Sequence, residues 1–149
     1  MALSASFRTS TDPEGLGAAL EALAVRFGMR TGIPLHVDNR VPQLRLKGSE
    51  EAEVYHVVQE ALANVERHAQ ARHVWLCVEP TLGGVEFRIE DDGIGSAPGL
   101  AGGPGHHGME IMRERARRLG AEHSVTARPG GGTVVRLALP LAKREGEVA

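Results

Sequence analysis

The sequence predicts a two-layer α/β sandwich in which helices cover one face of a mixed β-sheet. Alternating apolar residues in the second half of the chain indicate two strand pairs, and helices with one apolar side lie before and between them. Alternation gives a sheet one apolar face, and the apolar sides of the helices can cover that face. The chain of 149 residues, 42 % hydrophobic and 24 % charged, suits a single core of this kind.

The first helix is expected after Asp12-Pro13, which have the residue types of a helix cap and a first turn. Leucines and a phenylalanine then recur at helical spacing until Gly28. Apolar and polar residues alternate from Ile33 to Val37, which predicts a strand, and residues 39–48 have the composition of a connector.

The second helix is expected to begin near Ser49 and to run to about Gln70. Its apolar residues lie on one side, as in a helix that faces a core; they are Val54, Val57, Val58, Ala61 and Val65.

Two strand hairpins and a third helix complete the expected elements. The first hairpin joins Val74–Val78 to Val85–Ile89 through residues 80–84, and the second joins Val125–Arg128 to Thr133–Leu139. The third helix lies between them, from Gly108 to Leu119, and Gly120 supplies its stop. Seven glycines and two prolines between Gly93 and Gly108 predict a mobile loop.

These elements predict one domain over residues 16–140, with an N-terminal extension over 1–15 and a polar tail over 141–149. A net charge of -2 gives no broad cationic field, so we expect neither nucleic acid nor an anionic membrane surface as a partner. The lone Cys77 is expected to be a packed strand thiol in a reducing compartment. No stretch approaches the roughly 18 apolar residues of a membrane span, so we expect a cytoplasmic domain whose parent protein can still be anchored in a membrane.

Four polar residues on the second helix form the first candidate site. Glu60, Asn64 and His68 are four residues apart, Arg67 lies beside them, and the stripe that they form borders the buried side of the helix. An amide oxygen from Asn64 can ligate Mg²⁺, and Glu60 can orient or deprotonate a group one turn away. Arg67 and His68 would then meet phosphate oxygens. A solvated helix face explains these four residues equally well when they are taken alone.

Three glycine-containing segments form the rest of the candidate site. In Asp91-Asp92-Gly93-Ile94-Gly95, a carboxylate at a strand end can accept the exocyclic amine of adenine, and the glycines let backbone approach a flat base. Residues 102–108 lead into a helix whose free N–H groups favour phosphate. Residues 130–133 place Thr133 where it can bond the base or a bridging water. Taken alone, these segments also fit a tight turn, a flexible linker and a hairpin turn.

The joint order of these signals resembles the Bergerat nucleotide-binding fold of sensor histidine kinases, type II topoisomerases, mismatch-repair ATPases and ninety-kilodalton heat-shock chaperones. The segments Glu60-Ala-Leu-Ala-Asn64-Val-Glu-Arg67-His68-Ala69 and Gly108-Met-Glu-Ile-Met-Arg-Glu-Arg-Ala116, with Arg118-Leu119-Gly120, resemble the nitrate/nitrite-responsive branch of sensor kinases. The resemblance spans about Leu16 to Pro140.

The resemblance implies a role for each matching residue. Glu60 and Asn64 match the general base and the Mg²⁺ ligand, with Glu60 also able to reach the metal through water, and Asp91 matches the adenine-reading aspartate. Asp92 stands where asparagine is also common, and His106-His107 receive no catalytic role. Some of the expected nucleotide-binding residues match the glycine box and the phosphate-side glycines of the lid. The full expected set is Asn64, Arg67, His68, Asp91, Gly93, Gly95, Gly105, Gly108, Met109 and Thr133.

The leading interpretation is a catalytic domain that binds ATP with Mg²⁺ and transfers its γ-phosphoryl group to a histidine. That histidine would lie on the dimerisation helices of a parent homodimer, and a response regulator would be the indirect partner. None of the seven histidines has the context of such an acceptor. A stand-alone anti-sigma-type serine protein kinase is the alternative. An ATP-driven clamp is expected less, because it needs a following transducer domain and few residues follow the last strand. A non-enzymatic interaction module would fit a degenerate ATP site, and the intact set of Glu60, Asn64 and Asp91 argues against it.

Overall fold

The computed structural model describes residues 15–94 and 106–141, and the elements within these ranges form one sheet covered by helices. In chain order they are α2 (Gly15–Thr31), β1 (Leu35–Asn39), α3 (Gly48–Asn64), the π-helical segment η2 (Val65–Ala69), β2 (Val74–Thr81), β3 (Gly84–Asp91), α4 (His106–Leu119), β4 (Glu122–Ala127) and β5 (Thr133–Pro140). None of the described helices is both long enough and apolar enough to cross a membrane.

The five strands lie in the order β1-β2-β3-β5-β4. Strand β1 pairs with β2 in parallel, and the other three pairs are antiparallel. Both expected hairpins are therefore present, as β2–β3 and β4–β5. The two hairpins join through the pairing of β3 with β5, which aligns Asp91 with Thr133.

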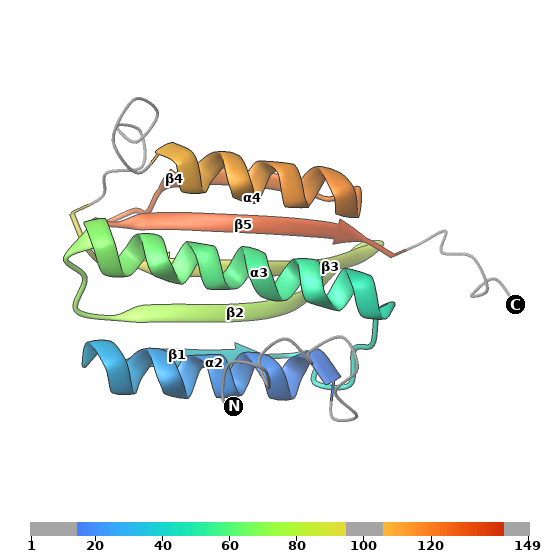
Figure 1. Ribbon diagram of the computed structural model, residues 1–149, viewed down its shortest axis with the longest axis horizontal. Coiled ribbons are helices and arrows are strands. Elements are labelled where there is room, and N and C mark those ends of the chain that lie inside the picture. Colours follow the sequence, from blue (N-terminus) through green and yellow to red (C-terminus); the bar gives the residue numbers. More distant parts are fainter. Residues whose placement is uncertain (1–14, 95–105, 142–149) are drawn as a thin grey trace, which may run out of the picture.

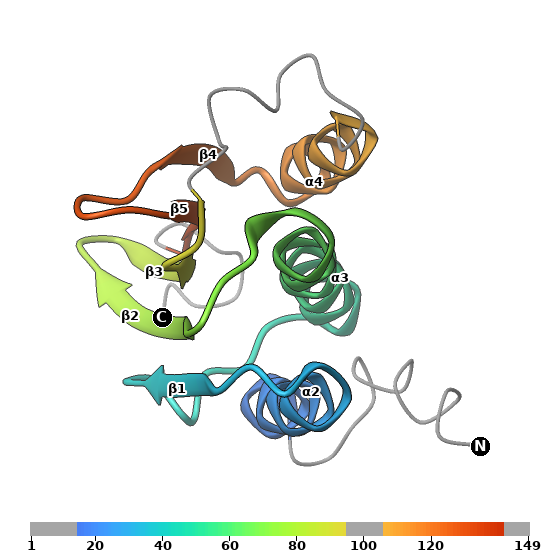
Figure 2. The same ribbon diagram turned by 90° about the vertical axis from the view of Figure 1, so that its left-hand side faces the viewer.

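Helices α2, α3 and α4 all lie on one face of this sheet, with α3 in the middle (Figures 1 and 2). Figure 2 shows the two layers end on, with the strands on one side and the helices on the other. The expected fold class, an α/β sandwich with a mixed sheet and helices on one face, is confirmed.

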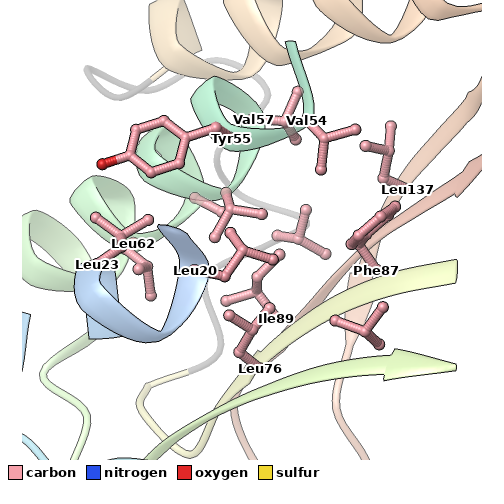
Figure 3. Packing of buried hydrophobic residues seen from close by; sticks show 14 of the residues in the cluster. Leu20, Leu23, Val54, Tyr55, Val57, Leu62, Leu76, Phe87, Ile89 and Leu137 are labelled. Carbon is pink, nitrogen blue, oxygen red and sulfur yellow. The ribbon is translucent and has the colours of Figure 1, made fainter. Parts of the chain in front are cut away.

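The core lies between the two layers and is built mainly by the residues of the predicted apolar patterns, together with others such as Leu62 (Figure 3). Leu20 and Leu23 come from α2, and Val54, Val57 and Leu62 come from α3. They meet strand residues that alternate with outward-facing ones, namely Leu76, Phe87, Ile89 and Leu137. Burial of these apolar side chains is the main free energy that holds the helices on the sheet.

Several boundaries differ from the expected ones, and two of these differences have a clear local reason. Helix α2 continues past Gly28 to Thr31, whose hydroxyl donates to Phe27 O at 2.8 Å, and it ends where Gly32 adopts a φ of +76°. Strand β1 begins at Leu35, because Pro34 has no N–H to donate to a ladder.

The start of α3 is held by a buried carboxylate. Glu51, in the first turn, is completely buried, and its Oε2 accepts hydrogen bonds from Leu46 N at 3.0 Å and from Arg45 Nε at 3.2 Å. These bonds tie the connector between β1 and α3 to the helix. They fix the position of α3 at the end opposite to its polar residues Glu60 and Asn64.

Candidate nucleotide-binding site

Most of the predicted site residues gather at one end of the sandwich. The last turn of α3, the end of β3, the first turn of α4 and the start of β5 all lie there (Figure 1). The predicted glycine-rich loop runs between two of these elements. Its residues 95–105, including Gly95 and Gly105, lie outside the described residues, as do the side chains of His106 and His107.

Glu60 and Asn64 lie one turn apart on α3 and both face the first turn of α4. A Cβ atom built on Gly108 would clash with Glu60 Oε2 and would lie 3.1 Å from Asn64 Oδ1. Residue 108 therefore approaches these two oxygens as closely as backbone can. The structure thus brings together Glu60, Asn64 and Gly108, which are far apart in the sequence. Met109, the next residue, is buried in the core beneath them.

Arg67 completes this group. Its Nη2 donates to Asn64 Oδ1 at 2.7 Å and lies 3.3 Å from Glu60 Oε2. The Arg67 side chain is 50 % exposed and that of Glu60 is 24 % exposed, so the pair lies at the surface of the site. A single cationic group thus bridges the two oxygens.

The helix that carries these residues differs from the expected one. It is α-helical only to Asn64 and widens into the π-helical segment η2 from Val65 to Ala69. The expectation that Glu60, Asn64 and His68 form one regular stripe is therefore wrong at His68, because the wider π-turn rotates His68 out of line with the other two residues. His68 is partly buried, and its Nε2 has no hydrogen-bond partner among the described residues.

Asp91 forms the second group, at the end of β3. Its side chain is buried, and Oδ1 accepts a hydrogen bond from Gly93 N at 2.8 Å. Burial raises the pKa of the Asp91 carboxyl, against the opposing effect of the N–H groups of Gly93 and Thr133. A buried carboxylate with a raised pKa, next to a glycine, is a candidate acceptor for a polar ligand.

The turn before β5 lies against this aspartate. Gly132 has a φ of +112°, and a Cβ atom there would overlap the carbonyl oxygen of Asp91. Only glycine can pass this close to β3 at position 132, and Gly130 and Gly131 before it also adopt positive φ, which favours glycine. The structure therefore brings together Asp91, Gly93 and Thr133. No hydrogen bond between the described residues links this group to Glu60 and Asn64.

Asp92 has a structural role that its sequence pattern does not reveal. Its Oδ1 accepts hydrogen bonds from Arg72 N at 2.8 Å and His73 N at 2.9 Å, and its Oδ2 lies 3.0 Å from His73 Nδ1. It ties the chain between η2 and β2 to the end of β3, directly beside Asp91. The only signal in the sequence is an acidic residue after a strand, which does not name a partner 20 residues away.

These contacts predict an acid-dependent contribution of Asp92 to stability. Burial opposes the charge, but the N–H groups of His73 and Arg72 and the His73 ring outweigh it and lower the pKa of Asp92 from 3.8 to about 2. A lowered pKa stabilises the folded state above the pKa of the unfolded chain, and this stability is lost as the pH falls through about 2.

Urea unfolding of wild type and Asp92→Asn from pH 7 to pH 2 measures this contribution. The wild type should be the more stable protein by about 1 kcal/mol above pH 5, a value that allows for solvent screening of this partly exposed group, and the difference should shrink between pH 4 and pH 2. A difference that stays constant with pH would contradict this role for the carboxylate.

Comparisons with known proteins agree with this geometry. Residues 49–143 match the family model of histidine kinase-, DNA gyrase B- and HSP90-like ATPases. The nitrate/nitrite sensor protein NarQ of Escherichia coli is 32 % identical over 145 residues, which cover 94 % of this chain and 25 % of NarQ. The nitrate/nitrite sensor protein NarX of Escherichia coli is 32 % identical over 130 residues, which cover 87 % of this chain and 22 % of NarX. The chain thus spans about a quarter of the length of these proteins.

A solved structure shares the fold. The blue-light activated histidine kinase EL346 of Erythrobacter litoralis superposes with a TM-score of 0.73 and 26 % sequence identity, over 87 % of this chain and 43 % of that one. The resemblance stated from the sequence motifs is confirmed by these matches. This chain therefore belongs to the family of histidine kinase-, DNA gyrase B- and HSP90-like ATPases, and within it has the fold and sequence of the ATP-binding catalytic domain of a sensor histidine kinase.

Proposed function

We propose that this domain transfers the γ-phosphoryl group of ATP to a histidine on the dimerisation helices of a two-component sensor kinase. The observation that carries the proposal is the convergence of Glu60, Asn64 and Gly108 at one end of the sandwich, with the buried Asp91 at the same end. A carboxylate, an amide oxygen and a bare helix start are the groups that phosphoryl transfer needs for positioning and for charge neutralisation.

The residues present fit ATP with Mg²⁺. Asn64 Oδ1 is a hard oxygen ligand, and the Glu60 carboxylate beside it can reach the same metal through water. Gly108 lies in the first turn of α4 and has no side chain, so these oxygens directly face that turn. The free N–H groups of such a helix start favour phosphate. When bound, Mg²⁺ would neutralise charge on the phosphate oxygens.

The adenine end of ATP, or of ADP as product, is assigned to the second group. Asp91 would accept the exocyclic amine of the base, with Thr133 beside it on the paired strand and Gly93 bonded to its carboxylate. By the sequence pattern, Gly95 is assigned to the same end of the nucleotide. Arg67, His68, Gly105, Gly108 and Met109 are assigned to the phosphate side. Glu60 would orient or deprotonate the incoming histidine, which makes it the catalytic residue of this set.

The partners follow from this chemistry. None of the seven histidines has the context of an acceptor, so a second element must present the acceptor. We assign that role to the dimerisation helices of a parent homodimer that is anchored in a membrane, with this domain on the cytoplasmic side and a response regulator as the later acceptor. The names of NarQ and NarX support assignment to the nitrate/nitrite-responsive branch.

The experiment is a transfer assay with [γ-³²P]ATP. The domain is joined to, or mixed with, the histidine-bearing helices of the parent kinase, and label on protein is followed in the presence of Mg²⁺. Acid-labile label on the helices is expected, because phosphohistidine hydrolyses in acid. Acid-stable label on an added protein would support the serine-kinase alternative, and an absence of label despite ATP binding would contradict transfer to histidine.

A further inference from the structure

The nucleotide site contains a cation of its own. The guanidinium of Arg67 donates to Asn64 Oδ1 at 2.7 Å, and the same Nη2 atom lies 3.3 Å from Glu60 Oε2. These two oxygens are also the ones that lie against Gly108, at the helix start assigned to phosphate. The positive charge therefore lies where the oxygens of Asn64 and Glu60 converge.

A metal ion would need one of the same atoms. An amide has a single oxygen, and a divalent cation that ligates it carries two positive charges. A guanidinium bonded to that oxygen at the same time would place like charges a few ångströms apart, which is unfavourable in a partly buried site. Arg67 and Mg²⁺ therefore compete for Asn64 Oδ1.

The side chain of Arg67 is free to make this exchange. It is half exposed and lies on the π-helical segment η2, beyond the end of α3. The other basic residue that pairs with η2, Arg30, bonds to Glu66 Oε1 at 2.8 Å. Thus Arg67 bridges the site, and its departure would leave that neighbouring ion pair unchanged.

We propose that Arg67 is a resident cation that holds the metal position before nucleotide binds and is displaced from Asn64 when Mg²⁺ arrives with ATP. This inference rests on the proposed function, because it gives the regulation of the same site. Arg67 acts here as a positioning residue: without metal, it holds Asn64 and Glu60 together and balances the charge of the Glu60 carboxylate. It also lowers the affinity of the site for Mg²⁺, so that metal binds firmly only together with phosphate.

The test is the factor by which Mg²⁺ tightens ATP binding. Calorimetry gives the Kd for ATP in EDTA and in excess Mg²⁺, and the quotient of the two is the Mg²⁺ enhancement. In Arg67→Met, no guanidinium bridges Asn64 and Glu60 when ATP binds in EDTA. When ATP binds in excess Mg²⁺, no guanidinium competes with the metal for Asn64 Oδ1. The enhancement should therefore rise about 10-fold above that of wild type, the size expected for a lost charged hydrogen bond.

Two variants serve as comparisons. Arg67→Lys keeps a positive charge but loses the planar fork, so its enhancement should lie between those of wild type and Arg67→Met. Arg30→Met removes the same charge from the neighbouring Glu66 pair, so its enhancement should equal that of wild type. A general loss of charge near the phosphates would instead affect both methionine variants alike.

The possible results distinguish a failure of the competition between Arg67 and Mg²⁺ from a failure of the proposed function. Wild type that binds ATP, with an enhancement that is unchanged or smaller in Arg67→Met, would overturn the competition and leave the proposed function standing. Wild type that does not bind ATP under either condition would overturn both.

Discussion

Replacing Glu60 with glutamine is expected to lower the rate of phosphoryl transfer by about 10²- to 10⁴-fold, the effect of losing a general base. Glutamine keeps the length of the side chain and an oxygen that can accept from Arg67 and lie against Gly108. It cannot take a proton from an incoming histidine. ATP affinity should therefore stay close to that of wild type while transfer slows.

The comparison with Asn64→Ala makes this prediction specific. Asn64 would hold Mg²⁺ in the ground state, so its loss should weaken Mg²⁺-dependent ATP binding as well as transfer. Calorimetry and single-turnover transfer, measured on both variants, distinguish the two roles. If Glu60→Gln abolished ATP binding, or transferred phosphate at the wild-type rate, the role given to Glu60 would be wrong even with the fold correct.

The fold could be predicted because its main signals are local. Alternation along β2, β3 and β5 and the one-sided apolar pattern of α3 each follow from the burial of one face, and the structure buries those residues. Pairing between β3 and β5 has no local signal, since 42 residues separate Asp91 from Thr133.

The site was predicted less completely, and the reasons are physical. The order of the motifs predicts that Glu60, Asn64 and Gly108 lie in one site, and the structure places them in contact. The widening at η2 has no compositional signal, because a π-turn is a local change in hydrogen bonding within a helix. The hydrogen bonds that Arg67 donates and those that Asp92 accepts depend on that turn and on the chain that follows it, so sequence spacing alone could not reveal them.

Replacing Asp91 with asparagine is expected to weaken ATP binding by about 5- to 150-fold, because a buried acceptor for the adenine amine is lost. The asparagine oxygen can still accept from Gly93 N, so the turn after β3 should keep its shape. Wild type should also prefer ATP to GTP, whose base lacks that amine. Calorimetry with both nucleotides, on wild type and variant, measures the change in affinity and the change in preference.

Asp92→Asn is the matched control, since it makes the same substitution at the adjacent residue. The Asp92 carboxylate accepts hydrogen bonds from the backbone of Arg72 and His73, so this variant should keep the ATP affinity of wild type at neutral pH.

The pH dependence of ATP affinity is a second criterion for the role of Asp91. Burial raises the pKa of Asp91, so the wild-type affinity should fall on acidification at a higher pH than an ordinary aspartate would give, whereas Asp91→Asn should lack this dependence. Unchanged ATP affinity in Asp91→Asn would rule out its assignment to the base.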